Sequence, residues 1–134
     1  MECEFSFICD SAQQAGNKLY ALGIGWDTIY APSVPIRHTQ MAFVTRLRAS
    51  VAEAGTQDVT IRIIDADGED VLPPIVQQLS LEIPPPAVHG NLNIVANLGG
   101  LEMKKFGAYA IHLVVNKVEM ARIGFSITPP PTTV

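Results

Sequence analysis

Apolar and polar residues alternate along most of this chain with a period of two. Near the C-terminus, for example, Tyr109, Ile111, Leu113 and Val115 are separated by smaller or polar residues. This period places every second side chain on one face of an extended strand, so the pattern predicts β-strands rather than helices. Eight segments show it: residues 3–9, 18–24, 41–48, 59–63, 78–83, 91–98, 108–115 and 121–127.

Glycine and proline separate these segments. The ten glycines and ten prolines lie mostly in the gaps, where they end strands. Many short strands with regular turns are typical of antiparallel sandwiches and barrels. We therefore expect an all-β fold, a single antiparallel β-sandwich of about eight strands, over residues 1–128. We also expect a loop at 11–17 and a proline-rich extended tail at 129–134, and only residues 50–54 could hold a helical turn.

The last two segments predict a hairpin with an irregularity. Asn116 and Lys117 fit a two-residue turn. A strict two-residue turn would pair odd positions of the first strand with even positions of the second. The apolar positions are odd in both strands, so we expect a longer loop or a β-bulge near residues 116–119.

Composition narrows the possible partners. The chain has 134 residues, of which 48% are hydrophobic and 16% charged, and this excludes a disordered protein. Nine basic against thirteen acidic residues give a net charge of -4, so we expect no nucleic-acid surface. The N-terminal residues lack the basic start of a secretory signal, and no apolar run approaches the roughly 18 residues of a membrane span. We expect a cytoplasmic protein that does not bind membranes.

The two cysteines give no sign of a redox or metal site. On one strand, Cys3 and Cys9 would lie about 20 Å apart, well beyond the roughly 7 Å that a disulfide allows. Their spacing places both on one face with Phe5 and Phe7, where they would act as small core residues.

Three segments carry a resemblance to known families. Residues 101–111 resemble the corner between strands E and F of immunoglobulin-like domains, with Tyr109 as the corner tyrosine. The resemblance implies that its hydroxyl bonds the backbone near residues 103–105. The whole chain is also similar to a family of uncharacterised bacterial β-sandwich proteins, through residues 18–29, 65–68 and 106–109. This implies an immunoglobulin-like fold and brings no known catalytic residues.

The densest acidic cluster contains Asp65, Asp67 and Asp70. These carboxylates offer the oxygen ligands of a Ca²⁺ site, but the spacing does not match an EF-hand loop, and we expect a hairpin turn without a structural metal instead. A metal-dependent hydrolase built on these three residues is the weakest of the functional hypotheses. Neither the three histidines nor any serine falls into a catalytic or metal-binding pattern, so we expect no cofactor and no bound metal.

An aromatic segment offers a second binding hypothesis. Trp26, the only tryptophan, is followed by Asp27 and Tyr30, and aromatic side chains on loops can contact sugars or partner proteins. This would be a small-ligand or carbohydrate-binding module. The competing interpretation is that Trp26 covers one end of the core.

The leading hypothesis is a non-catalytic protein-interaction module. The outward positions of the strand at 108–115 are Ala108, Ala110, His112 and Val114, which carry almost no charge. An exposed face of this kind is typical of a partner surface. We expect it to be covered by a second copy in a two-fold dimer or by another protein, or else by the N-terminal loop or the tail.

Overall fold

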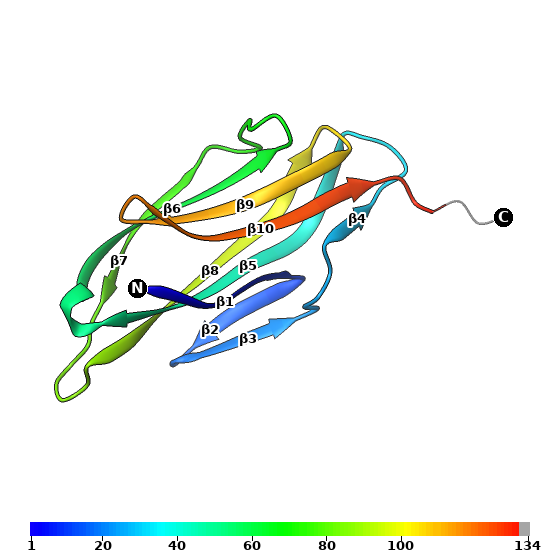
Figure 1. Ribbon diagram of the computed structural model, residues 1–134. Coiled ribbons are helices and arrows are strands. Elements are labelled where there is room, and N and C mark those ends of the chain that lie inside the picture. The colour runs from blue at the N-terminus through cyan, green and yellow to red at the C-terminus, as the bar shows by residue number, and fades with distance from the viewer. Residues whose placement is uncertain (132–134) are drawn as a thin grey trace.

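The computed structural model describes residues 1–131 and is built almost entirely of strands (Figure 1). The elements in chain order are β1 (Glu2–Cys9), β2 (Ser11–Ala15), β3 (Lys18–Leu22), β4 (Thr28–Tyr30), β5 (Ile36–Ser50), the 3-10 helix η1 (Val51–Glu53), β6 (Gly55–Asp65), β7 (Ile75–Leu81), β8 (His89–Met103), β9 (Gly107–Val115) and β10 (Val118–Thr128). The prediction of an all-β chain is confirmed, and η1 falls within residues 50–54, the segment that could hold a helical turn.

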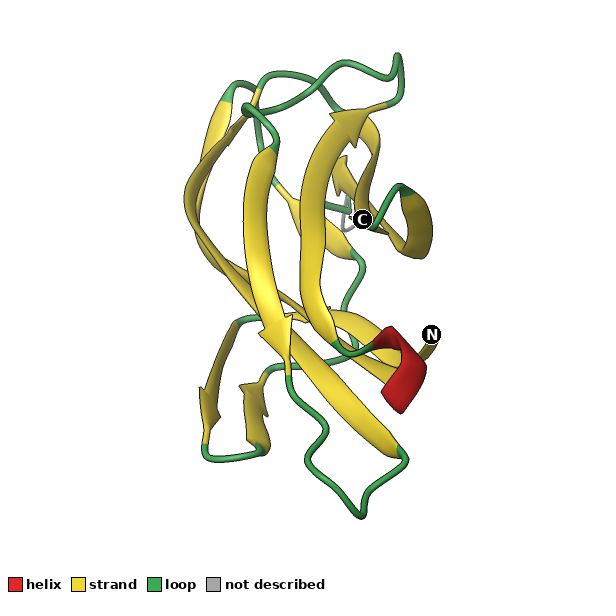
Figure 2. Ribbon diagram, turned by 90° about the vertical axis from the view of Figure 1, so that its left-hand side faces the viewer, coloured by secondary structure: helices red, strands yellow, loops and turns green. Residues whose placement is uncertain are grey.

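The strands form three sheets. One has three strands in the order β1-β5-β8, one has five in the order β4-β10-β9-β6-β7, and β2 with β3 forms a separate hairpin. Every pair is antiparallel except β4 with β10, which run parallel. The two larger sheets face each other, and the five-stranded one curves around the core (Figures 1 and 2).

The main core lies between the two larger sheets. Alternating residues of β5 and β8 meet the inward residues of β6, β9 and β10, as the period-two pattern predicts. The largest fully buried side chains include Phe43, Met41, Leu47, Ile63 and Ile111. Strands β1 and β10 contact each other and close one flank of this pair of sheets.

The β2–β3 hairpin covers the outer face of the three-stranded sheet. Its Leu19 and Ala12 pack against Ala42, Val44 and Cys9, which form a second buried cluster. The expectation of a loop at 11–17 is therefore wrong, because Ser11–Ala15 pairs with Lys18–Leu22. The side chains of this strand are small or polar, so it lacks the alternation that marks a strand with one strongly apolar face.

The hairpin between β9 and β10 has the predicted irregularity. Val115 pairs with Val118 across a two-residue turn, in which Asn116 and Lys117 have φ of 50° and 69°. The register then shifts between Glu119 and Ala121, which restores the odd-numbered residues to the core face.

A second register shift corrects the placement of the cysteines. It lies between Cys3 and Phe5, so Cys3 pairs with Leu47 whereas Cys9 pairs with Ala42. Leu47 belongs to the main core and Ala42 to the hairpin cluster, so the two cysteines do not share a face. Cys9 is buried, as expected, but Cys3 is exposed.

The C-terminal strand ends at Thr128. Residues 129–131 follow it without regular structure. The remainder of the expected tail, residues 132–134, lies outside the described residues.

Candidate functional site

The register of the five-stranded sheet collects small, uncharged side chains on its outer face. Ala108 pairs with Ser126, which pairs with Thr28, and Ala110 pairs with Gly124. We call the resulting surface the small-residue face. It consists of Thr28, Ala108, Ala110, Gly124, Ser126 and Thr128.

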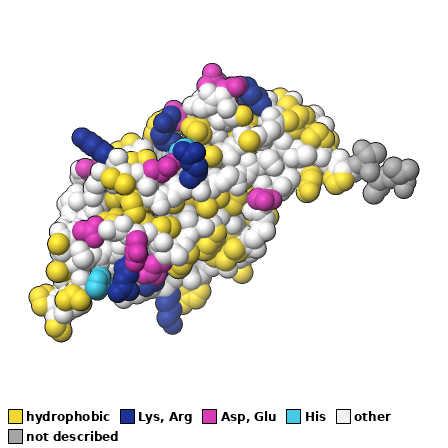
Figure 3. Space-filling model, in the orientation of Figure 1, with side chains coloured by type: hydrophobic (Ala, Val, Ile, Leu, Met, Phe, Trp, Pro, Cys, Tyr) yellow, Lys and Arg dark blue, Asp and Glu magenta, His cyan; other side chains and the backbone are white. Residues whose placement is uncertain are grey.

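Of the four predicted interface residues of β9, two belong to the small-residue face and two lie outside it. Ala108 is exposed and Ala110 half-buried on the small-residue face, while His112 and Val114 lie further along the strand. Tyr30, 58% exposed, pairs with Thr128 and so borders the same face. Figure 3 shows a pale area without charged side chains over the ends of β9 and β10 towards β4. The β2–β3 hairpin lies on the other large sheet, so it does not cover this face.

A charged group adjoins the small-residue face. The Oε1 atom of Glu119 lies 2.9 Å from Nδ1 of His112 and 3.2 Å from Nε of Arg122. On the other side of β9, Arg62 donates two hydrogen bonds to Asp70, of 3.0 and 3.3 Å. These five residues form what we call the His112 cluster. Figure 3 shows basic and acidic side chains gathered beside a histidine near the middle of β9. Nε2 of His112 is buried and has no hydrogen-bond partner among the described residues.

The aromatic segment does not form one platform. Trp26 packs against the main core, and its ring centroid lies 5.9 Å from that of His38. Tyr30 is on the outer face instead, because its neighbour Ile29 is buried in the core. The backbone carbonyl of Asp27 accepts a hydrogen bond from the N–H of Ser126 at 2.9 Å, which fastens the start of β4 to β10.

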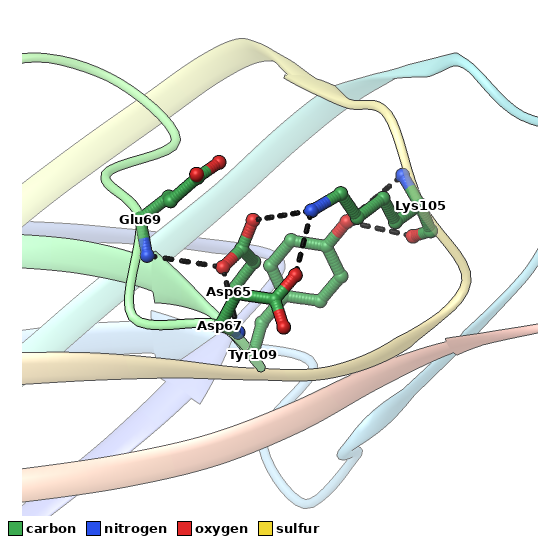
Figure 4. A network of polar contacts seen from close by, with 5 residues as sticks. All are labelled: Asp65, Asp67, Glu69, Lys105 and Tyr109. Atoms are coloured by element: carbon green, nitrogen blue, oxygen red, sulfur yellow. Dashed lines mark hydrogen bonds and ion pairs between the residues drawn. The ribbon is translucent and has the colours of Figure 1, made fainter.

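The acidic loop after β6 is held together from within (Figure 4). Oδ1 of Asp65 accepts hydrogen bonds from the backbone N–H groups of Asp67 and Glu69, at 2.9 and 3.0 Å. The ammonium of Lys105 lies 2.8 Å from Asp67 and 3.4 Å from Asp65. Asp70 turns away to Arg62, so the three carboxylates do not converge on one point. Within residues 1–131, no three His, Cys, Asp or Glu side chains are grouped to hold a metal ion.

Lys105 also fixes the protonation of this loop. Burial raises the pKa of Asp65, but the N–H groups of Glu69 and Asp67 and the Lys105 ammonium more than offset this, so the pKa is below its ordinary value. The carboxylates of Asp67 and Asp65 raise the pKa of Lys105. The loop is therefore an ion-paired turn at neutral pH.

Tyr109 lies directly beneath this loop. Its ring is 4% exposed and stacks on Phe125, with centroids 5.4 Å apart. Its hydroxyl donates a hydrogen bond to the carbonyl of Lys105 at 2.6 Å and accepts one from the N–H of the same residue at 3.2 Å. This is the backbone contact expected near residues 103–105.

The pKa of each of the two thiols is above its ordinary value. Burial raises the pKa of both Cys3 and Cys9, and the nearby carboxylate of Asp10 raises that of Cys9 further. A thiol with a raised pKa carries little thiolate at neutral pH.

Sequence reasoning missed a hollow lined by side-chain amides. It lies along β8 between that strand, β7 and the β2–β3 hairpin, and we call it the β7–β8 groove. Its lining includes Gln13, Gln14, Gln77, Leu79, Asn93 and Asn97, around a volume of about 360 Å³. These residues come from three separate segments, so no local motif in the sequence could reveal it.

The structure has no helix suited to crossing a membrane. Its one helix in the described part of the chain, η1, has three residues, and no helix there is long and apolar enough to span a bilayer.

Comparison with solved structures shows similarity to parts of two larger proteins. A β-glucosidase from Listeria innocua in complex with glucose matches with a TM-score of 0.50 and 6% identity, over 96% of this chain and 17% of that one. The alkylpurine DNA glycosylase AlkC from Pseudomonas fluorescens, bound to DNA with an abasic site analog, matches with a TM-score of 0.48 and 12% identity. That match covers 76% of this chain and 28% of the glycosylase.

This chain therefore spans less than a third of the length of either protein. At 6% identity, the similarity to the β-glucosidase concerns the fold alone. No match is found among curated proteins. The family model of DUF6941, a family of unknown function, matches residues 4–128. That match covers nearly the whole chain, and the protein belongs to this family of unknown function.

Proposed function

We propose that the protein is a non-catalytic protein-interaction module that pairs with a second copy through the small-residue face. The single observation that carries this is an uncharged outer face of the five-stranded sheet, where β4, β10 and β9 lie side by side. Ala108 and Ala110 have small side chains and Gly124 has none, so a second sheet could approach to the roughly 10 Å at which sheets pack. A two-fold axis through this face would bury it in both copies.

The border of the face supports the same proposal. Tyr30 lies at one side, and exposed tyrosines commonly provide contact area at protein interfaces. The His112 cluster lies at the other side, where the ion pairs of Arg62 with Asp70 and of Arg122 with Glu119 would form a polar rim around a small-residue centre.

The side chains that could serve catalysis are occupied or separated, which supports a non-catalytic role. Lys105 pairs with Asp65 and Asp67, and Arg62 pairs with Asp70. His112 pairs with Glu119, while His38 lies against Trp26 in another part of the fold. A hydrolase would need such groups aimed together at one reacting atom.

We also propose an immunoglobulin-like sandwich for the two large sheets. It is supported by the hydrogen bonds between Tyr109 and Lys105, which resemble the tyrosine corner of that fold. We also propose a cytoplasmic location without a membrane partner, which the two free cysteines support. The net charge of -4 supports the proposal that the protein does not bind nucleic acid.

Light scattering of the purified chain at micromolar concentration tests the dimer. We expect a particle of twice the 14.5 kDa chain mass. Ala110→Glu should return it to a monomer, because the substitution buries an unpaired charge at the centre of the face. Gln14→Glu, an equal change of charge on the exposed hairpin of the other sheet, should leave the dimer intact. A 14.5 kDa particle for the unmodified chain would overturn the proposal.

A further inference from the structure

Strand β8 has one edge without a partner strand. It pairs with β5 along nearly its whole length and is the last strand of its sheet. Alternate residues of such a strand direct their N–H and C=O groups away from the paired side. Among the residues that the structure describes, no backbone bond from β7 or the β2–β3 hairpin reaches this edge. Within residues 1–131, the only side-chain hydrogen bond to the backbone of β8 comes from Arg37, which donates to the carbonyl of Gly100.

This edge lacks the features that normally keep other strands away. Natural edge strands carry Lys, Pro, inward charges or bulges that prevent pairing with another chain. Residues 90–101 contain no Lys, Arg, Asp, Glu or Pro, and the β5–β8 pairing shows no bulge. The facing strand β7, also at a sheet edge, is equally free of charge over Ile75–Leu81.

The β7–β8 groove provides room beside this edge. At Asn93 the groove continues into a hollow of about 220 Å³ whose lining includes Arg46 and Glu82. At Asn97 the groove continues into a larger hollow, of about 770 Å³, whose lining includes Tyr20. The three together follow β8 from Asn91 to Asn97, about 20 Å at 3.3 Å per residue. That is the length of a strand of about six residues.

The lining fits the two sides of a strand. Leu79 and Ile94 present apolar side chains towards the core, whereas Asn93, Asn97 and Gln13 present amides on the hairpin side. Side-chain amides can donate to and accept from peptide groups. The Oδ1 atom of Asn93 is buried and has no hydrogen-bond partner among the described residues, so the groove holds an acceptor that lacks a donor.

We propose that the β7–β8 groove binds an extended, uncharged peptide segment of a partner protein, which adds to the free edge of β8 as a fourth strand of its sheet. Main-chain hydrogen bonds to β8 hold the segment, as in other cases of strand addition. Its side chains alternate between apolar residues facing Leu79 and amide or hydroxyl residues facing the hairpin. This surface is separate from the small-residue face, so either proposal can fail without the other.

The probe is an acetylated and amidated heptapeptide, Ser-Val-Asn-Val-Thr-Val-Asn. Titration into the ¹⁵N-labelled protein should shift the amide signals of residues 90–99 saturably. Alternate amides in that range, those on the free edge, should then exchange more slowly with D₂O, because they have gained a hydrogen-bond partner. Signal changes confined to other residues, or no saturable change at all, would contradict the proposal.

Two N-methylated versions of the peptide test backbone pairing directly. One has methyl groups on the first, third, fifth and seventh residues, and the other has them on the second, fourth and sixth. Only one set of N–H groups can face β8, so one version should lose binding and the other should retain it. Equal binding by both versions would show that the peptide backbone does not form hydrogen bonds with β8, and would overturn the proposal.

A matched pair of variants locates the site. Asn97→Lys places a charge in the groove and should weaken peptide binding by about ten-fold or more. Val76→Lys places the same charge on an exposed residue of the opposite face of β7 and should leave binding unchanged. If the Asn97→Lys variant does not fold, the two N-methylated peptides still test whether the segment pairs with β8. Saturable binding of maltohexaose at residues 90–99, without binding of the peptide, would assign the amides to a carbohydrate and overturn the proposal.

Discussion

Tyr109 and Lys105 hold each other through two hydrogen bonds, one in each direction between the phenol and the backbone of Lys105. The side chain of Lys105 extends from the same residue to Asp65 and Asp67. The loop between β8 and β9 is thereby tied both to the core and to the loop after β6. Lys105 thus links its own loop and the nearby Tyr109 to a loop that is about 40 residues away in the sequence.

Removing the Tyr109 hydroxyl tests the first of these connections. Tyr109→Phe should lower the free energy of unfolding by about 0.5–1.5 kcal/mol, the net value of a hydrogen bond. Tyr109→Ala should lower it by about 3–5 kcal/mol, because it also removes a buried ring. Urea denaturation measures both. A Phe variant as stable as the unmodified chain would show that the two bonds contribute nothing.

Acid should weaken the loop through Asp65. Its pKa is lowered in the folded state, so its stabilising effect is complete above the unfolded value of about 3.9 and is lost as pH falls through the folded pKa. Lys105→Met removes the partner but keeps the backbone bonds to Tyr109, and should move acid unfolding to higher pH. Far-UV circular dichroism during acid titration measures the midpoint. Glu2→Gln, at an exposed position, serves as the control, and an equal shift in both variants would refute this role of Lys105.

Calcium should not stabilise the protein. The oxygens that face each other in the acidic loop are already bound by Lys105 and by backbone N–H groups. A ligand that binds only the folded state raises the melting temperature by mass action. We expect the same melting temperature in millimolar calcium and in chelator, and a rise of several degrees in calcium would contradict this interpretation of the loop.

The turn between β9 and β10 offers a pair of substitutions with opposite effects. Lys117→Gly should raise stability by up to about 1 kcal/mol, because its positive φ of 69° costs a residue with a Cβ more than it costs glycine. Asn116→Gly relieves a similar φ but should destabilise. It removes the hydrogen bond that the Asn116 side chain accepts from the N–H of Asp58 and the one that it donates to the Gln57 side chain. Chemical denaturation compares the two, and stabilisation by both would show that these bonds contribute little.

The cysteines should differ in accessibility. A thiol-specific disulfide reagent should modify Cys3 in the folded protein and reach Cys9 only after unfolding, since Cys9 is fully buried beneath the hairpin. Reaction at Cys3 should become faster as pH rises, because burial raises its pKa and the thiolate is the reactive form. Cys3→Ser should abolish the reaction of the folded chain. Rapid reaction of both thiols in the folded protein without substitutions would mean that the β2–β3 hairpin opens readily.

The strands with one strongly apolar face could be predicted from the sequence, and so could some of their irregularities. Tyr109–Val115 and Ala121–Ile127 alternate clearly because one side of each enters the core. The bulge beside Glu119 followed from the parity of those apolar residues alone. Strand β4 has only three residues, and it forms because β10 offers it a parallel partner that no local pattern reveals.

The candidate surfaces were less predictable because they depend on strand order. Ala108 and Ala110 were identified as outward-facing, but their alignment with Thr28 and Tyr30 requires β4 to lie beside β10. The free edge of β8 follows from the same kind of long-range pairing. Trp26 showed the opposite problem, since an aromatic residue on a loop looks the same in sequence whether it faces a ligand or the core.

The β2–β3 hairpin has a consequence for synthesis on the ribosome. Residues 41–45 of β5 are fully buried on both faces, so any newly made chain that exposes them would risk aggregation. The hairpin precedes β5 in the chain and covers one of these faces, so this protection is available as soon as β5 emerges. The other face must wait for β6 to β10. The hairpin would thus limit the aggregation-prone surface of the nascent protein to one face of β5.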